Sequence, residues 1–169
     1  MSHVAKVDVE ITNLDDLAAA CKRIGLELVR GQQTYEWYGR SMGDGSIPEG
    51  FSAEDLGTCD HAIRIPEGHP IHETFERPYE IGVCKRRDGK PGFTLLWDYF
   101  CGGFGLWEFL GTKRTPDKSL ADGWEYDGQM PKLKQAYAIC AAQRVAAQRG
   151  FRIQEQTHQD GSVRMFLTK

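Results

Sequence analysis

The sequence has no long apolar run and little excess charge of either sign. No stretch of about 18 apolar residues occurs in its 169 residues, so the sequence predicts no membrane-spanning helix. The opening MSHVAKVDVEI lacks the basic and apolar regions of a secretory signal, so we expect a cytoplasmic protein without membrane contact. A net charge of -3, from 21 Lys and Arg against 24 Asp and Glu, excludes a strong overall field toward nucleic acid.

The sequence also lacks paired cysteines. Its 5 cysteines occur singly, without a C-x-x-C motif, so no disulfide framework is predicted. Cys21 and Cys140 lie on apolar helical stripes and Cys84 lies in an alternating strand pattern, where a small buried apolar side chain is the ordinary role. We therefore expect reduced thiols, no cysteine nucleophile and no cofactor.

The patterns that are present predict one α+β domain spanning residues 1–169. Hydrophobic residues make up 40% of the chain and charged residues 27%, as in ordinary globular domains. Period-2 alternation and turn residues predict strands at 4–11, 26–29 with 34–40, 61–65, 79–85, 93–100, 151–157 and 162–167. The order β-α-β-β-β-β-α-β-β predicts a mainly antiparallel sheet with two long helices packed on one face.

Both long helices carry recognisable end signals. Asn13 is placed to cap the first helix, whose apolar stripe ends at Gly25. Pro131 suits the first turn of the second, which ends with Arg149 and Gly150. The stripe of that second helix consists of Leu133, Tyr137, Cys140, Ala141 and Val145.

Two segments depart from this regular pattern, at about 41–59 and 111–130. Both are polar and rich in glycine, with helical hints only at 52–56 and, just before the second, at 106–110. They nevertheless contain Ile47, Phe51, Trp124 and Tyr126. Apolar side chains in polar loops either fold back on the core or form a contact surface, so these four are candidate partner contacts.

Five phrases together resemble a known family. They are the opening MSHVAKV, then LDDLAAACKRIGLEL, YEIGVCKRRDGKPGFTLLWDYF, LKQAYAICAAQRVAAQRGFRI and the final DGSVRMFLTK. They resemble the domain-of-unknown-function family twelve fifty-seven, related to the plastid hypothetical reading frame thirty-five, over roughly two-thirds of the chain. The resemblance implies no reaction and no catalytic residues. It is compatible with a host accessory protein or a virus-encoded inhibitory protein, with 32–78 and 111–130 holding additional residues.

One group of residues has the chemistry of a zinc site. Cys59, His61, His69, His72 and Cys84 offer thiolates and imidazoles, which are the usual zinc ligands. Their spacing fits no standard zinc motif, and exposed loop histidines beside a buried thiol explain the same residues. We therefore assign no metal.

A second group could line a ligand pocket. Asp98 lies between Trp97 and Tyr99 in an otherwise apolar strand, where an unpaired carboxylate would be costly. Arg64, Trp97, Asp98 and Arg164 are therefore the candidate residues for binding a small ligand or nucleotide. The alternative is a structural ion pair between Asp98 and Arg64 or Arg164.

A basic hairpin tip could contact nucleic acid. Lys85, Arg86, Arg87 and Lys90 surround a turn, and aromatic residues such as Trp37 and Tyr99 could stack on bases. Aromatic residues at strand spacing are more often core residues, so this function is not favoured. The leading hypothesis is a non-enzymatic binding or adaptor protein with a protein partner, and ligand binding, possibly with an enzymatic activity, is the alternative.

Overall fold

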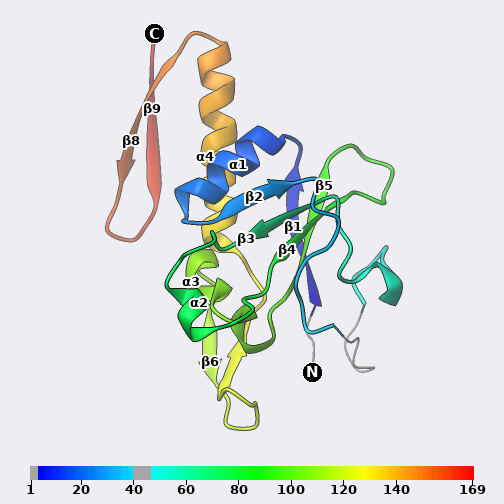
Figure 1. Cartoon of the computed structure of the whole chain (residues 1–169). Coiled ribbons are helices and arrows are strands. Elements are labelled where there is room, and N and C mark those ends of the chain that lie inside the picture. The colour runs from blue at the N-terminus through cyan, green and yellow to red at the C-terminus, as the bar shows by residue number, and fades with distance from the viewer. Residues whose placement is uncertain (1–3, 40–46) are drawn as a thin grey trace.

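The computed structural model describes residues 4–39 and 47–169. Its helices are α1 Leu14–Arg23, α2 Ile71–Thr74, α3 Leu106–Leu110 and α4 Pro131–Gln148, with 3-10 turns η1 Ala53–Asp55 and η2 Phe100–Gly103. Its strands are β1 Val4–Ile11, β2 Glu27–Arg30, β3 His61–Arg64, β4 Ile81–Lys85, β5 Phe93–Asp98, β6 Arg114–Pro116, β7 Trp124–Tyr126, β8 Arg152–Thr157 and β9 Val163–Thr168. Figure 1 shows a sheet with α1 and α4 beside it and a separate hairpin at the C-terminal end.

The central sheet has five strands in the order β1-β5-β4-β3-β2, and every neighbouring pair is antiparallel. One row of paired residues crosses it, from Ala5 through Trp97, Ile81 and Ile63 to Leu28. Because paired residues point to the same face, this row defines the face that packs against the helices. Trp97, Ile81 and Ile63 are fully buried there.

The two long helices begin where the sequence predicts. The Asn13 side chain accepts hydrogen bonds from the backbone N–H groups of Asp15 and Asp16, at 2.9 and 3.0 Å, and caps α1. α4 begins at Pro131. The Tyr137 hydroxyl of α4 accepts hydrogen bonds from the backbone N–H groups of Thr12 and Asn13, at 2.9 and 3.2 Å, which joins α4 to the start of α1.

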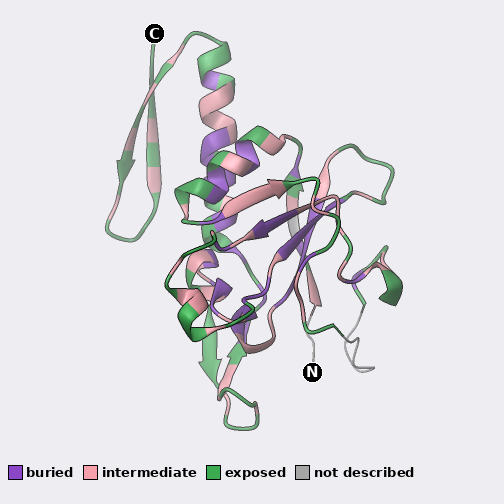
Figure 2. Cartoon of the chain, viewed as in Figure 1, coloured by how far each residue is buried: buried purple, intermediate pink, exposed green. Residues whose placement is uncertain are grey.

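Each face of the sheet has its own apolar cluster. The larger cluster joins the helix-facing strand residues to buried residues of α1 and α4, including Leu17, Cys21 and Leu133. The smaller cluster lies on the other face and contains Tyr35, Ala62, Cys84 and Leu96, with Trp37, Phe51 and Cys59 packed against it. The chain between β2 and β3 therefore covers the face that the helices leave open. Figure 2 shows the burial concentrated in the central strands and the helix between them and the hairpin.

The structure confirms the predicted α+β class, the mainly antiparallel sheet and most of the strand order, to which β6 and β7 are added. Three predicted strand segments differ in their pairing. The segment from Thr34 forms an isolated bridge with Thr58 instead of a strand of the sheet, and the Tyr35 ring lies over Gly82. The hairpin β8–β9 forms a two-stranded sheet of its own.

The two irregular segments are partly ordered by local structure. The second contains the short antiparallel pair β6–β7, and the predicted helical turn at 106–110 is α3. In the first, Ser52 and Asp55 form a capping box around η1; residues 41–46 of this segment lie outside the described part. No helix in the described ranges is long and apolar enough to cross a membrane.

Candidate functional site

The four residues predicted to line a ligand pocket lie apart. Trp97 and Asp98 have no exposed surface, and successive strand residues point to opposite faces. The Trp97 indole N–H donates to the Gly128 carbonyl at 3.0 Å, which anchors the end of the second irregular segment. Arg164 lies on the separate hairpin, opposite Gln156. The structure therefore does not assemble these residues around a common cavity.

Asp98 is held by backbone donors. One carboxylate oxygen accepts a hydrogen bond from the Phe100 N–H at 3.1 Å, and the other accepts one from the Tyr38 N–H at 3.4 Å. Arg64 forms ion pairs with Glu27 at 2.6 Å and Glu67 at 3.1 Å. Asp98 thus fixes the end of β5 and the chain after Trp37, and the charge of Arg64 is balanced at the rim of the sheet.

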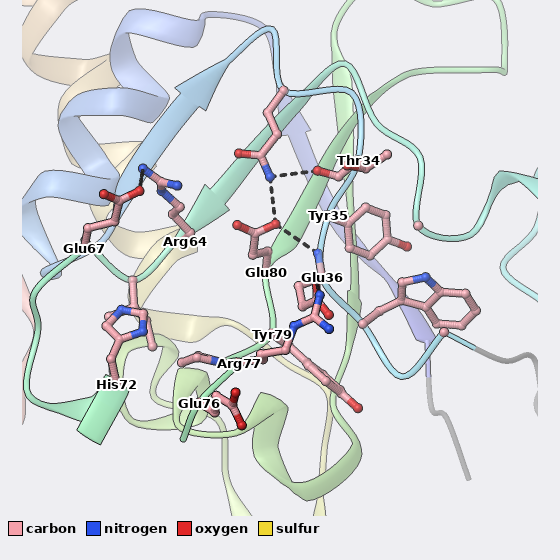
Figure 3. A pocket seen from close by; sticks show the side chains of 16 residues that line it. Thr34, Tyr35, Glu36, Arg64, Glu67, His72, Glu76, Arg77, Tyr79 and Glu80 are labelled. Atoms are coloured by element: carbon pink, nitrogen blue, oxygen red, sulfur yellow. Dashed lines mark hydrogen bonds and ion pairs between the residues drawn. The ribbon is translucent and has the colours of Figure 1, made fainter. Parts of the chain in front are cut away.

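A polar groove of about 570 Å³ lies beside the chain segments 32–39 and 76–80, with Arg64, Glu67 and His72 on one side (Figure 3). Its central carboxylate is Glu80, which accepts hydrogen bonds from the Gln32 side chain at 2.7 Å and from the Glu36 N–H at 2.9 Å. The Glu36 carboxylate in turn accepts a hydrogen bond from Arg77 at 3.0 Å. These contacts bind two irregular segments to each other.

The zinc candidates do not come together. The thiols of Cys59 and Cys84 donate to the carbonyls of Gln32 and Thr58, at 3.2 and 3.4 Å. Burial is the largest of the effects that raise the pKa of each thiol to about 12, so both stay protonated at neutral pH. His61 accepts a hydrogen bond from the Gly31 N–H at 3.0 Å. Among the described residues, no group of three or more His, Cys, Asp or Glu is placed to hold a metal ion.

The basic residues of the β4–β5 hairpin are balanced by acidic neighbours. Arg87 forms two hydrogen bonds to Asp55 at 2.6 and 2.7 Å, which hold the pKa of Asp55 well below its usual range. Arg86 pairs with Asp88, and Lys85 lies 3.5 Å from Asp60. The local field of this tip is therefore much weaker than its sequence indicates.

Most apolar residues of the irregular segments fold back on the chain. Phe51 packs on the smaller cluster, beneath the Arg87 guanidinium. Tyr126 is buried and donates a hydrogen bond to Asp122 at 3.1 Å. Trp124 is half-buried, and the Arg114 guanidinium lies 4.1 Å from its ring centroid. Of the four candidate partner contacts, Ile47 alone is an exposed large apolar residue.

A mainly apolar hollow lies between the last turns of α4 and the hairpin β8–β9. This apolar groove has a volume of about 330 Å³, and it is lined by Ala142, Val145, Ala146, Arg149, Phe151, Ile153, Met165 and Leu167. Val145 and Leu167 are 38% and 57% exposed. Figure 2 shows the hairpin in the colours of exposed and half-exposed residues, whereas Ala146 in the last turns of α4 is buried. Exposed aliphatic side chains on two facing elements are typical of a surface that binds another molecule.

The hairpin is fixed at one side of this groove by polar contacts. Glu155 of β8 accepts hydrogen bonds from Arg23 of α1 and Gln143 of α4. Gln135 of α4 donates to the Gly161 carbonyl in the hairpin turn at 3.0 Å. The turn end of the hairpin is thus held against the helices, while the groove occupies the other end, beside Val145 and Arg149.

Two basic residues lie at the apolar groove. Residues 142–169 contain five Lys and Arg and two Asp and Glu, a net charge of +3 in a chain whose total is -3, although Arg144 among them is paired with Asp16. Arg149 lines the groove, and the Lys169 amine lies 5.6 Å from the ring centroid of Phe151. Since Glu155 is already paired with Arg23, a molecule in the groove would meet a positive rim.

Comparisons with known proteins identify no relative: no family model, no curated protein and no solved structure matches this chain. The resemblance to the domain-of-unknown-function family twelve fifty-seven therefore stays a prediction.

Proposed function

We propose that this chain is a non-enzymatic adaptor that binds a partner protein in the apolar groove between α4 and the hairpin β8–β9. The observation that carries the proposal is the exposure of Val145 and Leu167 on facing elements at the edge of a groove lined almost entirely by apolar side chains. The partner segment is apolar on one side and carries Asp or Glu beside that side, because the groove rim is basic.

The other two hypotheses have less support, for one shared physical reason. In the polar groove, Arg77 is paired with Glu36, and the Glu80 carboxylate is occupied by donors from the chain itself. At the basic hairpin, Arg87 is likewise paired with Asp55. A ligand at either place would have to compete with hydrogen bonds and ion pairs already made within the chain. Covering the apolar groove, in contrast, removes apolar surface from water, which is favourable.

Synthetic amphipathic helical peptides test the proposal. Each has one leucine stripe, and the polar face carries Glu, Gln or Lys in three otherwise matched peptides. We expect the full chain to bind the Glu peptide about tenfold or more tightly than the Lys peptide, as measured by fluorescence anisotropy, with the Gln peptide between them. The preference should shrink in high salt, because exposed charges are screened.

Matched variants locate the binding surface. Val145→Asp and Leu167→Asp should each weaken binding of the Glu peptide about tenfold or more, since each places a carboxylate in the groove. Ile47→Asp introduces the same carboxylate in the first irregular segment, at a residue about as exposed as Val145, and should leave binding intact. Loss of binding in the Ile47 variant alone would move the docking surface to that segment, and absence of peptide binding by the unaltered chain would reject the proposal.

A further inference from the structure

The hairpin β8–β9 has less packing against the rest of the chain than a two-stranded sheet needs for stability. Its two strands pair only with each other within the described ranges, and each has six residues. A two-stranded hairpin is marginally stable in water unless further strands or a packed face support it. Here one face is only partly covered by the helices, and Phe166 on the other face is 44% exposed. No other strand of the described residues pairs with the outer edge of either strand.

The sequence of β9 is complementary to itself when read in the opposite direction. If two copies of β9 lie antiparallel about Met165, then Val163 faces the partner's Leu167 on one side and Arg164 faces the partner's Phe166 on the other. The first pair is apolar with apolar, and the second sets a guanidinium beside an aromatic ring. Met165 faces the partner's Met165, so no pair is mismatched.

The neighbouring strand β8 lacks this property. An antiparallel pairing of two copies about Glu155 would bring two carboxylates face to face, which is unfavourable. A pairing about Gln154 would set the apolar Ile153 opposite the partner's Glu155, while that carboxylate is already engaged by Arg23. These two β8 registers are unfavourable, whereas the β9 pairing about Met165 sets neither like charges nor a carboxylate and an aliphatic side chain opposite each other.

We infer that two copies of this chain associate through their β9 strands, which pair antiparallel about Met165 into one four-stranded sheet in the order β8-β9-β9-β8. Such an interface has two-fold symmetry, the commonest arrangement of soluble dimers. Val163, Met165 and Leu167 of both copies then form one continuous apolar strip on the sheet face that lines the groove. The inference concerns the strand edge and stands whether or not a peptide binds in the groove.

A charge pair introduced at the proposed contact tests both the dimer and its register. Sedimentation equilibrium of the full chain should show a dimer. Val163→Glu and Leu167→Lys should each weaken the dimer about tenfold or more, because each sets a charge opposite an apolar residue. An equimolar mixture of the two variants should restore a dimer containing one copy of each. In that dimer the introduced carboxylate faces the introduced amine at one end, and the unaltered Leu167 faces the unaltered Val163 at the other.

A control introduces the same two charges but places the lysine on β8, where it does not face the introduced carboxylate. Ile153→Lys lies on the same hairpin face as Leu167, yet on β8, away from the partner's Val163. Ile153→Lys copies should dimerise with each other as the unaltered chain does, but mixing them with Val163→Glu should not draw the Val163→Glu copies into mixed dimers. Circular dichroism of every variant should match that of the unaltered chain. A monomeric unaltered chain overturns the inference. Absence of mixed dimers with Val163→Glu and Leu167→Lys, or equal amounts of mixed dimer in the control mixture, overturns the register.

Discussion

Arg144 of α4 donates from Nε to both carboxylate oxygens of Asp16 on α1, at 3.1 and 2.8 Å. The Asp16 side chain is only 5% exposed, and this pair joins the helices on the side where α4 continues past the sheet toward the hairpin. Removal of one partner of such a pair leaves the other charge without compensation, which is destabilising.

Asp16→Asn should lower the free energy of unfolding by about 1–3 kcal/mol, because the amide cannot accept both bonds from the guanidinium. Chemical denaturation measures the change. Asp15→Asn is the control, since Asp15 is 81% exposed and pairs with the exposed Arg30. Its cost should stay below about 1 kcal/mol. Equal losses of unfolding free energy in the two variants would show that the buried Asp16 pair contributes no more to stability than the exposed Asp15 pair.

Gly82→Ala should destabilise the sheet through a steric contact. A Cβ atom at Gly82 would lie 2.6 Å from two atoms of the Tyr35 ring, which is far inside van der Waals contact. We expect a cost of about 1–3 kcal/mol in chemical denaturation. In a Tyr35→Ala background the same change should cost much less, because the ring that it meets is gone. A cost that is the same in both backgrounds would contradict this explanation.

Trp97→Phe should cost about 2–4 kcal/mol of unfolding free energy, for two reasons. It removes the hydrogen bond to Gly128, leaves that carbonyl without its indole partner, and opens space in a fully buried position. Trp124→Phe is the matched control, since Trp124 is half-buried and stacks on Arg114. Its loss should stay below about 1 kcal/mol, and a larger loss there than at Trp97 would contradict the assignment of the core.

Alkaline pH should destabilise the protein through its buried thiols. Burial raises the pKa of Cys21, Cys59 and Cys84 to about 12, so these thiols stay protonated when folded. The unfolded chain releases the same protons near an ordinary thiol pKa of about 8.5. The unfolded state therefore binds fewer protons above that value, and stability falls as pH rises from about 8.5 toward 12. Replacing Cys59 and Cys84 by Ala should reduce this slope, measured by urea denaturation across the range.

Local signals in the sequence are sufficient for most of the fold. Asn13 and Pro131 mark the starts of the long helices because capping and the fixed proline backbone act within one turn. The adjacent apolar residues of β5 and β4 mark the central strands, since a strand covered on both faces needs apolar side chains on both. These effects depend on near neighbours in the chain.

The candidate site depends on contacts that no local pattern encodes. Val145 continues the apolar stripe of α4, which predicts burial with Leu133, but its turn of the helix lies beyond the sheet and leaves it 38% exposed. The sequence could not reveal this, because the same stripe fits a helix that is covered along its whole length. Likewise, the ion pair between Arg87 and Asp55 joins residues 32 positions apart, so no local pattern shows that the charge of Arg87 is balanced.

The separation of the hairpin β8–β9 from the five-stranded sheet also bears on how cooperatively the molecule unfolds. The hairpin shares no ladder of backbone hydrogen bonds with the sheet in the described ranges, and its polar ties to the helices include those of Glu155 and the Gly161 carbonyl. Breaking them would release the hairpin while the main core stayed closed. Such an element opens by itself at a lower free energy than the whole domain. The amide protons of β8 and β9 would then exchange with solvent much faster than those of β4. Association of two β9 strands would slow exchange in the hairpin and so reduce this difference in rate.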